Sequence, residues 1–316
     1  MQNPSENQKI DQQPHLDHHH LPDHDQQPLA PVQQPPKPFT HHQPNGQPQP
    51  TQPVKEGGFK LHFAVNEEPN LGVRKEMEDC TISEPDLLGD GRFAFFCILD
   101  GHGGYTVSRF VRDNYAKLLK SKLEGFIDAK SVAEIINMTI DNTEKQLQMI
   151  GGRDCGSTFS GILFDLKVGR YYVINIGDSR SVRMKQVGPG QVDIKALSLE
   201  HKCSNEEEVK RVEKAGGSIL NGRLAGNLII TRSLGDFDFK KYGLISTPDI
   251  FEHHMEPNEV FVIASDGIWD TVHKENLEKM AGDIFNGSLA GSATKLTELA
   301  VSQGSTDNIS IILVKS

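Results

Sequence analysis

Short apolar segments that meet an aspartate recur through the sequence from residue 59 onward. The clearest cases are residues 95–99 running into Asp100, residues 260–265 running into Asp266, and residues 171–176 running into Gly177-Asp178. Asp307 comes just before a fourth apolar segment, residues 309–314. A single aspartate of this kind indicates only a turn. Because strand ends are rigid supports for ligands, the repetition favours a shared site for these carboxylates.

The same segments indicate the fold class. Aromatic and β-branched residues predict strands at 93–99, 158–164, 171–176, 260–264 and 309–314. The polar, glycine-containing connection at 165–170 predicts a hairpin between the second and third of these strands. Helices and hairpins alternate without a regular βαβ rhythm, so we expect an α+β protein of mixed layers rather than a doubly wound sheet.

Three segments have the spacing or the end signals of helices. Apolar residues recur at helical intervals in 105–123 and again in 131–150. The third helix is predicted at 205–215, where Asn205 serves as N-cap, three glutamates fill the first turn, and Gly216-Gly217 ends the helix.

The first 58 residues have a different composition from the rest. They consist mainly of Gln, Pro, His, Asp and Asn, with seven histidines and few aliphatic side chains. Such a segment cannot bury enough apolar surface to offset the entropy of ordering. We therefore expect a disordered Gln/Pro/His-rich tail at 1–58, which is either a spacer or a recruitment site for a partner, and one catalytic domain at 59–316.

Charge and cysteine usage exclude several classes of protein. The formal net charge is -10, so the chain lacks the basic surface that nucleic acid requires. No secretory signal, myristoylation site or apolar stretch of membrane-spanning length is present, which predicts no membrane association. Cys80, Cys97, Cys155 and Cys203 are widely spaced and are read as free thiols of a cytoplasmic or nuclear protein.

The candidate ligands are hard oxygen donors. No His or Cys lies at zinc-finger spacing among the aspartates, so the ligand chemistry suits Mg²⁺ or Mn²⁺ better than Zn²⁺ or copper. Several carboxylates in one cleft repel one another unless cations neutralise them. We expect a pair of ions about 3.5 to 4 Å apart.

Seven motifs resemble those of the metal-dependent serine/threonine protein phosphatases of type 2C (the PPM family), and they occur in the family's order. They are Arg74-Lys75-Glu76-Met77-Glu78-Asp79, Asp100-Gly101-His102-Gly103-Gly104, Gly156-Ser157-Thr158, Gly177-Asp178-Ser179-Arg180, Thr231-Arg232-Ser233-Leu234-Gly235-Asp236, Ser265-Asp266-Gly267-Ile268-Trp269-Asp270 and Ser305-Thr306-Asp307-Asn308-Ile309-Ser310. The resemblance implies a four-layer α-β-β-α sandwich with two central antiparallel sheets. It also implies hydrolysis of phosphoserine and phosphothreonine in proteins, which reverses kinase signalling.

The resemblance also implies roles for the metal-site residues. Asp100 would bridge both ions, Gly101 would offer its carbonyl oxygen, and Asp266 and Asp307 would complete the second site. Glu78 and Asp79 would act mainly by holding waters on the metals. Asp178 and Asp270, together with Asp266, resemble a weaker third-metal site, whereas Asp236 and Asp238 are left out of the metal set.

Three further residues are candidates for contact with substrate. The planar fork of Arg74 matches phosphate oxygens, although a surface ion pair is the alternative. His102 is the expected general acid for the departing seryl or threonyl oxygen. Arg223 lies in the segment 204–227, where the family carries a flap beside the cleft. Contact with substrate and an ordinary loop position are both open for Arg223.

Three alternative functions require residues or spacings that differ from these. A cysteine-dependent phosphatase needs an arginine six residues after its nucleophile, and the four positions concerned hold Asp86, Gly103, Gly161 and Val209. An aspartyl-phosphate hydrolase could use the spacing of Asp236 and Asp238, but the preceding residues make a poor strand. A catalytically inactive relative would have lost ligands, and no proposed ligand is missing. We therefore expect an active phosphatase, acting as a monomer on phosphoprotein substrates.

Overall fold

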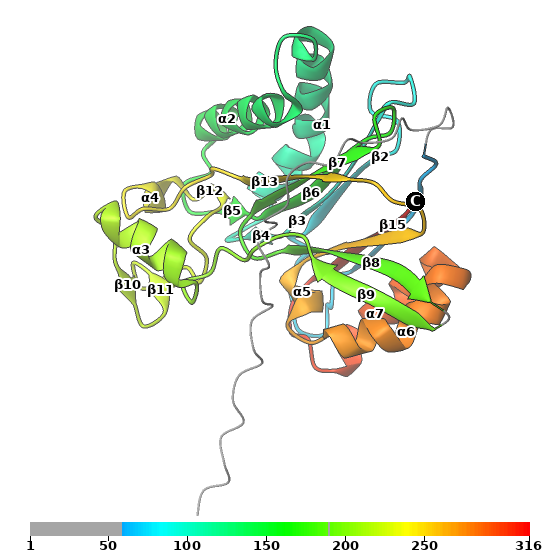
Figure 1. The fold of residues 1–316 in the computed structure, drawn as a ribbon. Helices are drawn as coiled ribbons and strands as arrows, with labels where there is room; N and C mark the ends of the chain where they lie inside the picture. Colours follow the sequence, from blue (N-terminus) through cyan, green and yellow to red (C-terminus); the bar gives the residue numbers. More distant parts are fainter. Residues whose placement is uncertain (1–58, 189) are drawn as a thin grey trace, which may run out of the picture. The chain divides into compact units, whose positions relative to one another are not determined.

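A computed structural model of the chain describes residues 59–188 and 190–316. The predicted tail at 1–58 lies outside the described residues. Two five-stranded antiparallel sheets stack face to face, and helices cover the outer face of each (Figure 1). The predicted four-layer α-β-β-α sandwich is therefore confirmed.

The first sheet joins the two ends of the domain. β1 pairs along its whole length with β15, so that His62 lies opposite Lys315 and Glu68 lies opposite Ile309. The sheet's strands, in spatial order, are β1 (His62–Glu68), β15 (Ile309–Lys315), β14 (Glu259–Ala264), β8 (Arg180–Gly188) and β9 (Gln191–Ala196).

The second sheet contains the predicted hairpin. Its strands, in spatial order, are β13 (Asp249–His254), β7 (Arg170–Ile176), β6 (Phe159–Asp165), β3 (Phe93–Leu99) and β2 (Cys80–Glu84). β3 is buried on both faces. Its odd-numbered residues face the outer helices, and Ala94, Phe96 and Ile98 pack in the core between the two sheets. This double burial explains why the strand reads as an unbroken apolar run.

The outer helices bury apolar faces against the sheets. α1 (Thr106–Phe126) and α2 (Val132–Ile150) cover the second sheet, while α5 (Asp266–Trp269), α6 (Lys274–Asn286) and α7 (Leu289–Ser302) cover the first (Figure 1). α2 begins with a capping box between Ser131 and Glu134, which satisfies backbone N–H groups that a helix otherwise leaves unpaired. None of the helices in the described part of the chain is long and apolar enough to cross a membrane.

Smaller elements lie at one end of the sandwich. β4 (Gly101–His102), β5 (Gly156–Ser157) and β12 (Leu234–Gly235) form a three-stranded sheet, with α4 (Phe237–Lys240) directly after it. The segment containing α3 (Glu206–Lys214), β10 (Ile219–Leu220) and β11 (Arg223–Leu224) forms a separate lobe (Figure 1). We call this lobe the flap.

The predicted strands and helices all form, with ends that move by no more than three residues. Asn205 caps α3 as predicted, because its side chain accepts a hydrogen bond from the backbone of Glu207. The four cysteines are buried and free. Helices α6 and α7 were not predicted. The buried face of α7 includes Ser292, Ala293 and Ala300, and such small residues give a weak apolar signal.

Candidate active site

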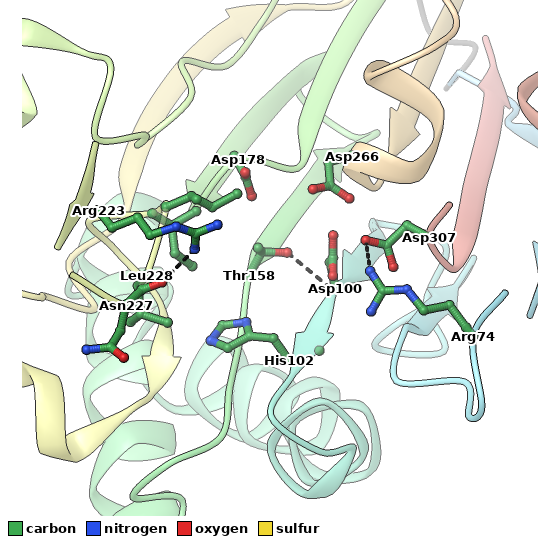
Figure 2. Close-up of a pocket in the computed structure, with 13 residues that line it drawn as sticks. Arg74, Asp100, His102, Thr158, Asp178, Arg223, Asn227, Leu228, Asp266 and Asp307 are labelled. Carbon is green, nitrogen blue, oxygen red and sulfur yellow. Dashed lines mark hydrogen bonds and ion pairs between the residues drawn. The ribbon is translucent and has the colours of Figure 1, made fainter. Parts of the chain in front are cut away.

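The aspartates predicted to converge do line one cleft. A cavity of about 220 Å³ opens where the ends of the two sheets meet the flap (Figure 2). Its walls include eight of the predicted site residues: Arg74, Asp100, Gly101, His102, Asp178, Arg223, Asp266 and Asp307. Glu78, Asp79 and Asp270 lie outside these walls.

Strand pairing explains why residues so far apart in sequence meet here. Asp266 follows β14 and Asp307 precedes β15, and these strands are antiparallel neighbours, which places both residues at one end of the first sheet. Asp100 follows β3 in the second sheet. Its backbone is tied to Thr158 by two hydrogen bonds, of 2.9 Å from the Thr158 N–H and 3.1 Å to the Thr158 hydroxyl. The Thr158 hydroxyl also contacts that of Ser179 at 2.7 Å, beside Asp178.

The surroundings of the carboxylates in the cleft disfavour their ionised form. Burial, followed by the charge of Asp266, raises the pKa of Asp100 well above its usual range. Burial and the charges of Asp178 and Asp307 raise the pKa of Asp266 to about 7. Buried oxygens of Asp79 and Asp266 have no hydrogen-bond partner in the described part of the protein. Divalent cations would both neutralise these charges and occupy the unpartnered oxygens, so the donor set fits Mg²⁺ or Mn²⁺.

The carboxylates are spread around the cleft rather than drawn together. Within residues 59–188 and 190–316, no three Asp, Glu, His or Cys side chains are gathered closely enough to form a complete ligand cluster. Hard cations of this kind keep several waters and bind through only one or two carboxylates each. The spread therefore suits ions that are partly hydrated, and the role of Glu78 and Asp79 in holding waters stays a prediction.

The segment that carries Glu78 and Asp79 packs directly behind the cleft. The backbone N–H of Glu78 donates to the side chain of Asn308 at 2.9 Å, next to Asp307. Gly101 approaches this segment so closely that an added Cβ atom would lie 2.4 Å from the Glu78 carbonyl oxygen. A side chain at Gly101 would therefore displace the residues expected to support the metals.

Arg74 reaches the cleft from the loop after β1. Its guanidinium group forms an ion pair with Asp307 (Figure 2). Its Nε also donates to the Thr306 carbonyl oxygen at 3.0 Å. The alternative of a pair with a glutamate of its own motif is not observed. Because 40% of the side chain is exposed, the guanidinium remains accessible to a phosphate group entering the cleft.

The predicted third-metal residues have a different neighbour. The ammonium nitrogen of Lys202 lies 3.4 Å from Asp178 Oδ2 and 3.8 Å from Asp270 Oδ1. It also lies 3.1 Å from Glu200 Oε1. A protein cation thus lies beside two of the three carboxylates that were assigned to a third ion.

His102 has a carboxylate partner that sequence reasoning missed. Its Nε2 lies 2.6 Å from Oδ2 of Asp236, a residue that had been left out of the predicted site. Burial alone lowers the pKa of His102, but the hydrogen bond and charge of Asp236 outweigh burial and raise that pKa above its usual value. The only sign in the sequence that Asp236 belongs to the site was its position at the end of the motif 231–236.

Arg223 borders the cleft from the flap. Its Nη1 donates to the Asn227 carbonyl oxygen at 2.7 Å, which holds the guanidinium group at the rim (Figure 2). The flap is anchored through the buried carboxylate of Glu208, which accepts hydrogen bonds from Arg211, Arg232 and Thr231. A contact between Arg223 and substrate stays a prediction.

Taken together, the sandwich, the acidic cleft and the arginine at its edge define a metal-dependent phosphohydrolase. The family model described as Protein phosphatase 2C matches residues 63–309. Probable protein phosphatase 2C 59 of Oryza sativa subsp. japonica is 32% identical over 265 residues, covering 82% of this chain and 78% of the relative. The integrin-linked kinase-associated serine/threonine phosphatase 2C of Bos taurus is 28% identical, covering 77% and 74% respectively.

Solved structures show the same fold. A serine-threonine phosphatase 2C from Toxoplasma gondii has a TM-score of 0.66 at 21% identity and covers 80% of this chain and 94% of its own. A sex-determining protein of C. elegans has a TM-score of 0.71 at 21% identity, covering 83% and 65%.

The chain belongs to the protein phosphatase 2C family, whose members are metal-dependent serine/threonine protein phosphatases. Its match spans 66% of Probable protein phosphatase 2C 32 of rice and 62% of Probable protein phosphatase 2C 25 of Arabidopsis thaliana, so it covers just under two thirds of some relatives.

Proposed function

We propose that this chain is an active phosphatase that hydrolyses phosphoserine and phosphothreonine in proteins by in-line attack of water on phosphorus. The observation that carries the proposal is the presence of Arg74, His102 and the aspartates 100, 266 and 307 around one cleft. An inactive relative that only binds phosphoproteins is the competing function. The complete set of candidate ligands favours catalysis.

Two divalent ions are proposed for the main site. Asp100 and the Gly101 carbonyl group would hold them on one side, and Asp266 and Asp307 would hold them on the other. When bound, such ions supply a water of lowered pKa and screen the charge of the phosphate. A third ion at Asp178 and Asp270 is less favoured, because it would have to share these carboxylates with the Lys202 ammonium group.

The protein's own side chains bind and orient the substrate. Arg74 offers two N–H groups in a plane that matches two phosphate oxygens, and this orients phosphorus toward the acidic floor of the cleft. His102 donates a proton to the seryl or threonyl oxygen as its bond to phosphorus breaks. Arg223, at the rim, is proposed to contact either the phosphate or the residues that flank it in the substrate protein.

The function is tested by phosphate release from a phosphothreonine peptide in Mn²⁺ and in EDTA. We expect turnover in Mn²⁺ only, and equal rates in both would exclude the metal-dependent mechanism. As a control, Asp238→Asn, a change at an exposed side chain, should keep full activity in Mn²⁺. Binding of the phosphopeptide without any turnover in Mn²⁺ would instead support the inactive relative.

We also propose a monomer in the cytoplasm or nucleus, with a tail that recruits a partner. The four free, buried cysteines suit a reducing compartment. Light scattering of the full chain tests the monomer. The peptide assay repeated after deletion of residues 1–58 tests the tail. A changed rate would mean that the tail affects turnover itself, and an unchanged rate would mean that it matters only for native protein substrates.

A further inference from the structure

Asp236 is buried against the catalytic histidine. Only 1% of its side chain is exposed, compared with 30% of the His102 side chain. Oδ2 of Asp236 lies 2.6 Å from His102 Nε2 and also accepts a 2.6 Å hydrogen bond from the Ser233 hydroxyl. The backbone N–H of Asp236 donates to the Cys155 carbonyl oxygen at 2.9 Å. The carboxylate is therefore held at both its side chain and its backbone.

The small three-stranded sheet brings these two residues together. β5 lies in its centre, and Gly156 of β5 pairs with His102 of β4 on one side and with Gly235 of β12 on the other. A Cβ atom at Gly156 would lie 2.1 Å from Asp236 Oδ2 and 2.7 Å from His102 Nε2. The histidine and the aspartate thus meet in space that only a glycine leaves open.

A largely buried ion pair between Glu144 and Lys240 supports the segment that contains Asp236. Glu144 of α2 accepts a 2.9 Å hydrogen bond from the Gly235 backbone N–H and forms a 2.6 Å ion pair with Lys240. Lys240 in turn donates to the Ser233 carbonyl oxygen at 2.9 Å. Two residues just before Asp236 are therefore held in place, Gly235 by Glu144 of α2 and Ser233 by Lys240 of α4. Asp236 itself adopts the left-handed backbone region, with φ of 49°. Such conformations persist where the surroundings enforce them, often beside active sites.

The contact with Asp236 determines which ring nitrogen of His102 is available to a substrate in the cleft. Asp236 occupies Nε2, and Nδ1 is the ring nitrogen left for the substrate, because His102 lines the cavity (Figure 2). We propose that Asp236 is a positioning residue that directs His102 to act as general acid through Nδ1. This role rests on the proposed function.

The proton balance follows from that orientation. As water forms its bond to phosphorus and the phosphorus–oxygen bond to serine or threonine breaks, the Nδ1 proton moves to the departing oxygen. The Nε2 proton stays on the ring, so the Nε2–H group continues to donate a hydrogen bond to Asp236 Oδ2. The imidazole is left neutral, and the proton released by the attacking water passes to solvent or restores the imidazolium.

The experiment must distinguish a role of Asp236 in positioning His102 from a role in stabilising the fold. The two substrates are a phosphothreonine peptide, whose alkoxide leaving group needs a proton, and p-nitrophenyl phosphate, whose phenolate leaves without one. In Mn²⁺ we expect Asp236→Asn to lower kcat on the peptide by about 10-fold to 100-fold, less than the roughly 100-fold to 10,000-fold of general acid catalysis, because His102 itself remains. On p-nitrophenyl phosphate the loss should stay below about 3-fold, because this reaction gains little from an acid.

A double-mutant cycle provides the second readout. In the His102→Gln background, Asp236→Asn should cause no further loss on the peptide, since residues acting as one unit are not additive. Asp238→Asn is the matched control. It makes the same chemical change two residues away. The Asp238 side chain is exposed, and its ion pair with Arg153 is a long one, 3.8 Å from Asp238 Oδ1 to Arg153 Nη1, so both rates should be unchanged.

The outcomes distinguish the two proposals. Equal losses on both substrates, or additive losses in the cycle, would overturn the positioning role while leaving the phosphatase proposal intact. Wild-type protein that is inactive on both substrates in Mn²⁺ would overturn the phosphatase proposal itself. If thermal melting shows that Asp236→Asn does not fold, Ser233→Ala takes its place. Loss of that hydroxyl should give a smaller, still peptide-selective effect, and a uniform effect would contradict the role.

Discussion

The ammonium nitrogen of Lys202 lies 3.4 Å from Oδ2 of the buried Asp178, at the edge of the acidic cleft. Burial lowers the pKa of Lys202, but the charges of Asp178, Glu200 and Asp270 more than reverse this and raise the pKa above its usual value. Lys202 therefore remains a cation at any physiological pH. A metal ion bound by Asp178 and Asp270 would therefore have to compete with the Lys202 ammonium group.

Lys202→Met should strengthen metal binding at this edge. Removal of a unit charge about 4 Å from the carboxylates leaves their repulsion unbalanced, so the weakest Mn²⁺ site should tighten at least about tenfold. Titration of Mn²⁺ followed by electron paramagnetic resonance measures the change. Lys210→Met, which removes a lysine from the exposed face of α3, is the control. An unchanged titration would show that Lys202 does not compete with metal.

Asp266→Asn should abolish turnover but stabilise the metal-free protein. The raised pKa of Asp266, about 7, shows that its ionised form is held in an unfavourable place by burial and by neighbouring carboxylates. The neutral amide removes that repulsion, and we expect the melting temperature without metal to rise by a few degrees, about 1 kcal/mol. Mn²⁺ should stabilise the wild type more than the variant in thermal melting. Near-normal activity would refute the ligand assignment.

Arg74→Ala should lower kcat/KM on phosphorylated substrates, because it removes hydrogen-bond donors to the phosphate group. The loss of charge-assisted hydrogen bonds, each about 1.5 to 3 kcal/mol, predicts a fall of about tenfold to a hundredfold in kcat/KM on the phosphothreonine peptide. Arg74→Lys should recover only part of it, because an ammonium group lacks the planar fork. Lys75→Ala, at the adjacent exposed position, serves as the control. If Arg74→Ala retained full kcat/KM, the pair with Asp307 would be purely structural.

Glu208→Gln should loosen the flap in a pH-dependent way. Burial alone would raise the pKa of Glu208, but hydrogen bonds from Arg232, Arg211 and Thr231 lower it to about 2. A pKa lowered in the folded state stabilises the protein above the ordinary value of 4.5, and that contribution is lost as the pH falls toward 2. We expect the variant to lose about 2 kcal/mol at pH 7 in urea unfolding.

The difference between this variant and wild type should shrink below pH 4.5, to less than about half by pH 3. Glu206→Gln, on the exposed side of the same helix, should change stability by less than about 0.5 kcal/mol. A difference that does not vary between pH 7 and pH 3 would mean that the charge of Glu208 does not hold the flap.

Much of the fold could be predicted because its signals are local. The buried strand β3 was located from residues 93–99 alone, since aromatic and β-branched residues favour a pleated, buried strand whatever their partners are. Asn205 was recognised as a cap because capping chemistry acts within three residues. The end of a strand is likewise visible in the sequence, which is how Asp100, Asp178, Asp266 and Asp307 were found.

The relations between these elements needed the tertiary structure. His102 and Asp236 are 134 positions apart and meet only because the small sheet aligns β4, β5 and β12. Lys202 reaches Asp178 across a loop, and nothing in the spacing of the two residues predicts that contact. The sequence alone indicated the carboxylates, Arg74 and His102 as candidate chemical groups, because residue type and strand propensity are local properties, but it did not indicate Asp236. The pairing of distant strands decided which of them face one another, because register and topology depend on the whole packed chain.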